Sequence, residues 1–316
     1  FLKQPLLKEN DVKKIQKLSK ADPKNFNTRR LDILFNKNDN FKKIKSKLAH
    51  ISKKAEELVE ANNVKILILS DKNVSKNSVP FPSLLAVSSV HHHLIKKGLR
   101  TECSIIIETG EAREVHHFCV LAGYGAEAIF PYLALDTVKL LAKDLKHKTK
   151  SNYSDYENNY ITAIGKGILK VMSKMGISTY QSYNGAQIFD AVGLNSIFIE
   201  KFFKGTSSLI EGAGFKEIIT ESKNRHESAT NFKKNKIDKL QVGGEYAYRL
   251  KGEQHVWDPT SISALQHSIK SNDSNKYKEY AGYVNGDRAG TLNPRSLFSI
   301  KKAKSKVNKE EVEPAE

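Results

Sequence analysis

The chain has 316 residues, 39% of them apolar, and its 52 basic residues outnumber its 35 acidic residues to give a formal net charge of +17. This length predicts two domains, each with a hydrophobic core, and no apolar run is long enough to span a membrane. The two cysteines, Cys103 and Cys119, are too few for a disulfide framework or a cysteine-only zinc site, and they suit a reducing, cytoplasmic compartment. Only eight of the basic residues are arginines, the side chain that best reads bases and phosphates, so the charge is interpreted as solvated lysine-rich surface and no nucleic-acid partner is expected.

The first half of the chain alternates helical and strand patterns. Residues 41–61 place Ile44, Leu48, Ile51 and Leu58 at helical spacing, and residues 64–70 form an apolar run typical of a strand buried on both sides. The alternation continues with helices at 84–98, 111–125 and 132–148 and with strands at 103–109 and 126–130. Strands that alternate with helices predict a parallel sheet covered by helices.

Residues 146–158 are polar and nearly free of aliphatic side chains, so a domain boundary is predicted near residue 150. A helix is expected at 159–175, followed by a strand at 177–183 and by a helix at 184–194 with Asn184 as its N-cap. The polar segment 220–240 predicts a loop, and the alternating apolar pattern around a turn at 242–259 predicts a hairpin. The last predicted helix covers 260–271.

Five of the ten histidines lie between residues 90 and 118: His91, His92, His93, His116 and His117. Consecutive residues on a helix point about 100° apart, so the first three histidines cannot all face one metal ion. Glu114 precedes His117 by three positions, as in the Glu-x-x-His motif of di-iron helix bundles, but that design needs four facing helices. These histidines are interpreted as structural, with a metal-dependent hydrolase as the competing hypothesis.

The segment MSKMGISTYQSYNGAQIF covers residues 172–189, and its first glycine, Gly176, lies where the backbone can approach a planar ligand closely. Met175 is soft enough to lie against a flat ring, and Ser178 and Gln181 offer hydrogen bonds. An ordinary tight turn explains the same residues. Chemistry alone leaves both interpretations open.

Four segments together resemble the large subunit of glutamate synthase: SLLAVSSVHHHLIKKGLRT, ETGEAREVHHFCVLAGYGAEAIFPYLA, GKGILKVMSKMGISTYQSYNGAQIFDAVGL and GGEYAYRLKGEQHVWDP. The likeness runs nearly continuously from about residue 28 to residue 316. It implies an α/β fold in which a parallel α/β central domain, residues 1–150, is followed by the first part of a (β/α)8 TIM-type FMN barrel, residues 151–316.

The resemblance implies an enzyme that makes two glutamates from glutamine and 2-oxoglutarate. An amidotransferase domain releases ammonia, which passes through a tunnel to FMN, where reduced flavin delivers hydride to an imine. A 3Fe-4S cluster relays electrons from a small NADPH-dependent subunit or from ferredoxin. The chain holds neither the amidotransferase cysteine nor three clustered cysteines, so it is expected to be a segment of a longer enzyme and inactive alone.

In flavin barrels the end of the first strand commonly lies against the isoalloxazine ring. The resemblance therefore implies five cofactor-binding residues and no catalytic or metal-binding residue in this chain: Met175, Gly176, Ile177, Ser178 and Gln181. A backbone N–H near the ring would tune the electronics of the cofactor, which performs the hydride chemistry.

Two further segments are weaker candidates. His255–Asp258 are expected to come near the flavin, and Arg113 and Glu114 are interpreted as an ion pair in preference to the lining of an ammonia path. The functional alternative from another class is a non-catalytic α/β scaffold that braces a barrel and binds nothing.

Overall fold

The computed structural model describes residues 4–145, 152–230, 248, 252, 254–286, 292 and 307–312. The chain divides into two compact units, Phe1–Lys234 and Asn235–Glu316. Across the described ranges, no helix combines the length and the apolar character that a membrane crossing requires.

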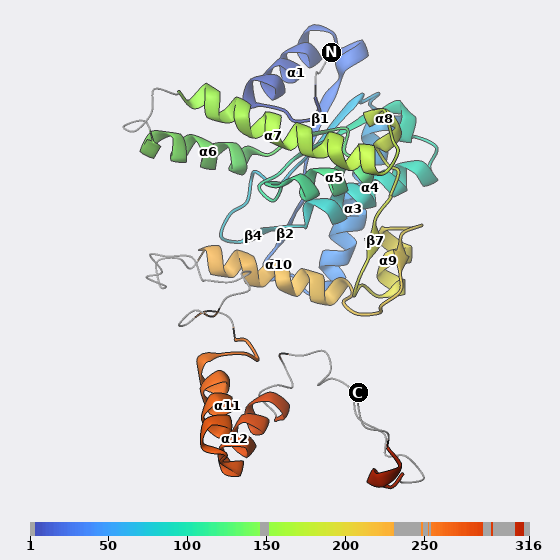
Figure 1. The fold of residues 1–316 in the computed structure, drawn as a ribbon. Coiled ribbons are helices and arrows are strands. Elements are labelled where there is room, and N and C mark those ends of the chain that lie inside the picture. Colours follow the sequence, from blue (N-terminus) through green and yellow to red (C-terminus); the bar gives the residue numbers. More distant parts are fainter. Residues whose placement is uncertain are drawn as a thin grey trace. The chain divides into compact units, whose positions relative to one another are not determined.

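The first unit consists of a parallel sheet, two small strand pairs and the helices that cover them (Figure 1). Its helices are α1 Glu9–Ala21, α2 Pro23–Phe26, α3 Phe41–Glu60, α4 Ser83–Lys96, α5 Val115–Gly123, α6 Tyr132–Leu145, α7 Tyr153–Lys174, α8 Tyr180–Tyr183, α9 Ser196–Phe202 and α10 Phe215–Thr230. Its strands are β1 Thr28–Asp32, β2 Leu34–Asn36, β3 Ile66–Ser70, β4 Ser78–Pro80, β5 Ser104–Glu108, β6 Ala128–Phe130, β7 Asp190–Ala191 and β8 Ser207–Ser208. A short 3-10 helix, Arg100–Glu102, precedes β5.

The main sheet has the strand order β1-β3-β5-β6, and every pairing in it is parallel. The segment at Leu6 extends the sheet beyond β6, because the N–H of Leu7 donates to the carbonyl of Ile129 at 2.8 Å and the N–H of Ile129 donates to Pro5. β3, β5 and β6 are almost fully buried, as expected for strands with both faces covered. The predicted α/β class and its parallel sheet are confirmed.

The helices that follow these strands form for the reasons that the sequence suggests. In α3, Ile44, Leu48, Ile51 and Ala55 are buried on one face, and the side chain of Asn40 caps the first turn by accepting from Lys43 N at 2.9 Å. Burial of this stripe against the sheet stabilises the helix, because each of its leucine and isoleucine side chains contributes about 1.5–3 kcal/mol when fully removed from water.

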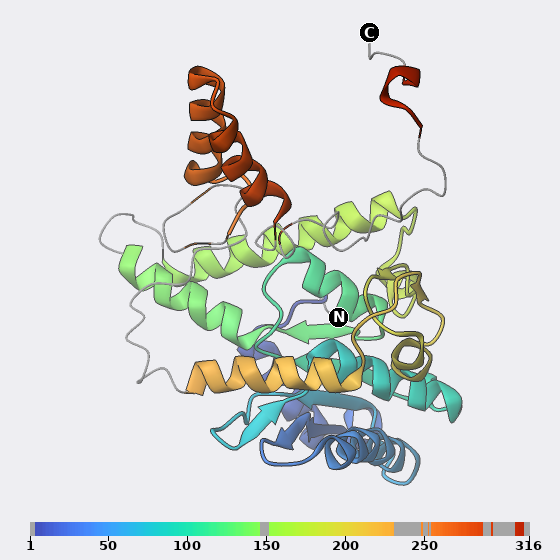
Figure 2. The ribbon, with the colours of Figure 1, turned by 90° about the horizontal axis from the view of Figure 1, so that it is seen from below.

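α7 belongs to the same hydrophobic core as the sheet. Ile161, Ile164, Ile168 and Met172 are buried along one side of it. α7 packs against α5 and α6 (Figure 1 and Figure 2). A side chain at Gly167 would overlap Val115 of α5, so the glycine allows the two helices to approach closely. The core continues across the predicted division near residue 150, and that division stays a prediction about the longer fold.

Two elements after α7 differ from the sequence prediction. The segment 177–183 is not a strand: it turns into the single-turn helix α8 after Thr179, whose hydroxyl accepts from Ser182 N. The aromatic residues decide this outcome, because Tyr180 and Tyr183 lie one helical turn apart and donate to backbone carbonyls at Ala126 and Cys119. Both tyrosines therefore reach the core from a helical turn, which an extended strand with side chains on alternating faces would not permit.

The predicted helix at 184–194 is also wrong. Residues 186–189 have no regular structure, and β7 follows and pairs with β8 in parallel. The predicted loop at 220–240 is wrong as far as Thr230, because α10 occupies Phe215–Thr230. Although its sequence is polar, α10 buries Ile219, Ser222 and His226 against β4 and its neighbouring turn. A supporting surface supplied by distant residues stabilises this helix, as for most helices in proteins.

The second unit contains a helical hairpin formed by α11 Pro259–Ser271 and α12 Ser274–Asn285. Asp258 caps α11 by accepting from Ser261 N at 2.8 Å, and Asn272 makes the turn with a left-handed φ of 49°. α11 confirms the helix predicted at 260–271. The predicted β-hairpin at 242–259 lies largely outside the described residues, and a 3-10 helix at Lys309–Glu311 follows farther on.

Candidate functional site

Buried polar groups gather at the carboxyl ends of β3 and β5, the edge at which parallel α/β sheets commonly bind ligands. Glu108 is 1% exposed, and its carboxylate accepts from Ser70 Oγ at 2.5 Å and pairs with the Arg30 guanidinium at 3.1 Å. Asp71 accepts from Thr109 Oγ1 at 2.6 Å. Burial raises the pKa of Asp71, although its hydrogen bonds oppose that shift.

A cavity of about 640 Å³ opens beside this cluster, and its polar groups largely satisfy one another. Glu111 accepts from the N–H and the hydroxyl of Ser83 at 2.7 and 2.8 Å and pairs with Arg225 at 3.5 Å. His226 bonds the carbonyl of Ser75 through Nε2 at 2.8 Å. The cluster is therefore best explained as a network that fixes the loops after β3 and β5 and the helix α10.

The residues expected to bind flavin lie at the corner after α7. Met175 ends that helix and is 49% exposed, and Gly176 has a left-handed φ of 70° with nothing within 4 Å of where a side chain would begin. Ile177 is half-buried, and its N–H donates to the carbonyl of Met172 at 3.0 Å. Ser178 is exposed, and Gln181 lies one turn farther on, exposed on α8.

A groove opens near this corner. Ser178 lines this groove of about 480 Å³ together with Met172 and Tyr180. The absence of a side chain at Gly176 leaves room for a ring to approach the backbone. Of the five residues expected to bind flavin, only Ser178 lines this groove. Met175 and Gly176 are exposed beside it in the sequence, and Gln181 is exposed on α8.

The three consecutive histidines of α4 face three different environments. His91 is buried, and its Nδ1 accepts from Arg100 Nε at 2.9 Å. His92 Nδ1 lies 2.9 Å from the carbonyl of Ser88, one turn earlier on the same helix. His93 Nε2 lies 2.5 Å from Glu56, which also binds Lys97 at 2.8 Å.

The histidines of α5 are likewise engaged in local contacts. His116 meets the ring of Phe189 edge-on, and His117 Nε2 lies 3.2 Å from Glu114. The expected ion pair between Arg113 and Glu114 is wrong, since the contact of Glu114 within the described part of the chain is with His117. Over that same part, no three His, Cys, Asp or Glu side chains are placed to hold a metal ion.

The segment His255–Asp258 lies in the second unit, where it leads into α11. Asp258 is the cap of that helix, and Trp257 is half-exposed with its ring 6.2 Å from the ring of Tyr280. This placement assigns Asp258 a structural role. The suggested proximity of the segment to flavin stays a prediction.

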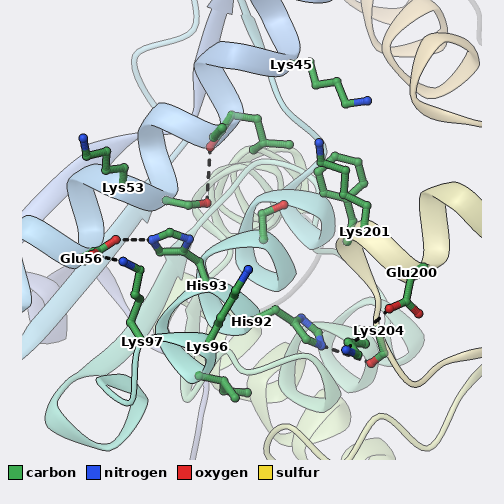
Figure 3. A pocket seen from close by; sticks show the side chains of 16 residues that line it. Lys45, Lys53, Glu56, His92, His93, Lys96, Lys97, Glu200, Lys201 and Lys204 are labelled. Atoms are coloured by element: carbon green, nitrogen blue, oxygen red, sulfur yellow. Dashed lines mark hydrogen bonds and ion pairs between the residues drawn. The ribbon is translucent and has the colours of Figure 1, made fainter.

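One feature escaped the sequence analysis: a groove of about 990 Å³ between α3, α4 and α9, in which lysines predominate (Figure 3). Its lysines come from residues 45–53, 96–97 and 201–204, and no local motif links these segments. The sequence held one indication of this groove: Ser89, His93 and Lys96 are spaced to share one face of α4.

The profile of the family described as glutamate synthase central domain matches residues 1–195. The chain is 41% identical over 289 residues to the glutamate synthase [NADPH] large chain of Bacillus subtilis, covering 92% of this chain and 18% of that protein. It is 38% identical over 288 residues to glutamate synthase [NADH] of Saccharomyces cerevisiae, covering 89% and 13%. Ferredoxin-dependent glutamate synthase of Pyropia yezoensis is 38% identical over 298 residues, with 91% and 19% covered.

The chain thus spans 13–19% of the length of these three relatives. Among solved structures, a mandelate oxidase variant with a monooxide FMN adduct matches at a TM-score of 0.35 and 8% identity, over 58% of this chain and 60% of that one. That likeness is too low to support an argument, whereas the family profile covers well over half of the chain. The chain belongs to the glutamate synthase central domain family.

Proposed function

We propose that this chain is a segment of a glutamate synthase that carries ammonia from glutamine to 2-oxoglutarate and reduces the product to glutamate. The observation that carries the proposal is the identity of 38–41% with three glutamate synthases over at least 89% of the chain. The three relatives are named for NADPH, NADH and ferredoxin, so the reductant of this enzyme is one of these. A cytoplasmic location agrees with two free, buried cysteines.

Within that enzyme we assign the corner after α7 to one wall of the FMN site, with residues 151–316 opening the barrel and residues 1–150 bracing it. Support comes from the exposed Met175, the open backbone at Gly176 and the groove at Ser178. FMN supplies the hydride when it is bound. The residues of this chain would hold the ring edge and exclude water from it, with Gly176 admitting close approach and Met175 covering one face.

The remaining parts of the enzyme lie outside this chain in the proposal. Cys103 and Cys119 are both buried, and burial raises the pKa of each thiol, which is opposite to the activation that a cysteine nucleophile or an iron ligand requires. The amidotransferase nucleophile and the ligands of a 3Fe-4S cluster are therefore assigned to other segments, as is the docking site for a small NADPH-dependent subunit or ferredoxin.

The test is an assay of the glutamate synthase polypeptide that contains this chain. The proposal predicts bound flavin and glutamate formation that depends on glutamine, 2-oxoglutarate and one reductant supplied in turn as NADPH, NADH or reduced ferredoxin. Flavin-free protein with no glutamate formation under any reductant would favour the scaffold alternative. Metal that survives dialysis and is lost in His117→Ala would favour the hydrolase alternative.

A further inference from the structure

The groove between α3, α4 and α9 collects positive charge from three helices (Figure 3). Six lysines and two acids line it: Lys45, Lys53, Lys96, Lys97, Lys201 and Lys204 with Glu56 and Glu200. Both acids are already engaged, Glu56 by His93 and Lys97 and Glu200 by Lys204. The groove therefore carries an excess of cations that its own carboxylates do not neutralise.

The side chains of Lys45 on α3 and Lys201 on α9 lie at the same end of the groove (Figure 3). Burial lowers the pKa of Lys201, and the charge of Lys45 lowers it further. Neither lysine has a carboxylate partner among the described residues. Aromatic rings face both ammonium groups, Phe215 at 5.9 Å from Lys45 Nζ and Phe202 at 5.6 Å from Lys201 Nζ. An anion between two neighbouring ammonium groups would relieve their repulsion, and this arrangement suits a phosphate group.

An unsatisfied hydroxyl lies within the same groove. Ser89 Oγ is inaccessible to solvent, lines the groove, and has no hydrogen-bond partner in the described structure. A buried hydroxyl without a partner costs about 1–3 kcal/mol, so native proteins seldom keep one unless a ligand or water completes it. Ser89 lies one and two turns from His93 and Lys96, on the same face of α4.

The groove has the dimensions of a small-molecule site. Its volume of about 990 Å³ lies at the upper end of the range of ligand pockets, roughly 300–1,000 Å³. Leu48, Ala49, Ile95 and Phe202 add apolar surface between the lysines. An inorganic ion would leave most of this surface unused, whereas an organic molecule with a phosphate chain would contact both kinds of lining.

We propose that this groove binds a small molecule carrying a diphosphate or triphosphate group, with Lys45, Lys96 and Lys201 around the phosphates. A rotation of the Ser89 side chain would turn its hydroxyl into the groove to bond a phosphate oxygen. The chemistry fits a nucleoside polyphosphate or an inorganic polyphosphate of the same length. The proposal does not depend on the assignment of flavin to Met175–Ser178.

The test is calorimetric titration of the full chain with inorganic tripolyphosphate, pyrophosphate, ADP and AMP, repeated at raised salt. We expect tripolyphosphate and ADP to bind and AMP to bind at least tenfold more weakly. Tighter binding of ADP than of pyrophosphate assigns the site to a nucleotide, and equal binding assigns it to the phosphate chain alone. Absence of binding by both tripolyphosphate and ADP overturns the proposal.

The variant Lys45→Gln/Lys201→Gln is expected to weaken binding by about tenfold or more, because each lysine makes a charge-assisted hydrogen bond. The matched control is Lys42→Gln/Lys47→Gln, which removes the same charge from residues of α3 that do not line the groove. Equal weakening in the two variants would show general attraction of anions to a basic protein and would overturn the proposal.

Ser89→Ala separates a ligand-binding hydroxyl from a structural one. The hydroxyl has no partner to lose in the free protein, so the free variant is expected to keep or slightly raise its melting temperature. Its affinity for tripolyphosphate is expected to fall by about threefold or more. A variant that is destabilised without ligand and binds with unchanged affinity would remove Ser89 from the site. Unchanged binding in both Ser89→Ala and the Lys45/Lys201 variant would overturn the proposal.

Discussion

The Nε–H of Arg100 donates a hydrogen bond to Nδ1 of His91 at 2.9 Å, so this nitrogen of the buried imidazole carries no proton. The same guanidinium binds Glu127 at 2.8 Å and the carbonyl of Gly125 at 3.0 Å. It thereby joins the end of α4 to the turn between α5 and β6. Burial, reinforced by the positive charge of Arg100 and by His92, lowers the pKa of His91 to about 3.

Stability should fall as the pH falls below about 6.5. In that range the unfolded chain takes up a proton at His91 that the folded protein excludes until the pH approaches about 3. Between about pH 7 and about pH 5 this single group should remove about 2 kcal/mol from the free energy of unfolding. His91→Gln, whose amide oxygen can still accept from Arg100, should lose less over the same interval. Urea unfolding of both proteins measures the difference, and parallel pH profiles would contradict it.

Gly125→Ala should be strongly destabilising. Gly125 has a φ of 107°, and a side chain there would overlap the His91 imidazole, which cannot move without breaking its bond to Arg100. We expect the free energy of unfolding to fall by about 3 kcal/mol or more. Gly98→Ala is the matched control, because Gly98 also has a positive φ, 72°, but nothing within 4 Å of the new atom. Its cost should be about 1 kcal/mol. Similar unfolding midpoints for the two variants would refute the steric explanation.

Arg30 and Glu108 should be energetically coupled. Glu108 is almost fully buried, and removal of Arg30 leaves its carboxylate with Ser70 and the more distant Lys72 at 3.9 Å. Arg30→Met should cost about 2 kcal/mol, which allows for the partial exposure of the arginine. The double variant Arg30→Met/Glu108→Gln should recover about 1 kcal/mol, because no buried charge remains unpaired. If the losses of unfolding free energy in Arg30→Met and Glu108→Gln simply add in the double variant, the two side chains are not coupled.

Periodicity in the sequence predicted the sheet and its helices because local and global preferences agree there. The runs 66–70 and 104–108 hold apolar residues at consecutive positions, so both faces of each strand must be buried. The apolar residues of α3 lie on one face, so only that face of the helix is buried. Short edge strands such as β1, with Arg29 and Arg30 at its centre, were missed because a half-exposed strand carries little periodic signal.

Errors arose where distant residues decide the local structure. Tyr180 and Tyr183 have a high strand propensity, yet carbonyl acceptors at Ala126 and Cys119 favour a helical turn. α10 has a polar sequence, and its buried side is defined by β4 and the turn at Ser75. The lysine groove could not be predicted for the same reason, since its lysines converge only after α3, α4 and α9 have packed.

Flavin occupancy of two glycine variants is the most direct test of the proposed flavin wall. Gly176 and Gly98 both follow a helix, have φ values of 70° and 72°, and have nothing within 4 Å of an added side chain. Asn tolerates this conformation, so Gly176→Asn and Gly98→Asn carry the same small backbone cost. The flavin absorbance per polypeptide should be measured for both variants in the glutamate synthase that contains this chain. We predict a clear loss of flavin in Gly176→Asn and a full complement in Gly98→Asn, and full occupancy in both would contradict the placement of flavin at this corner.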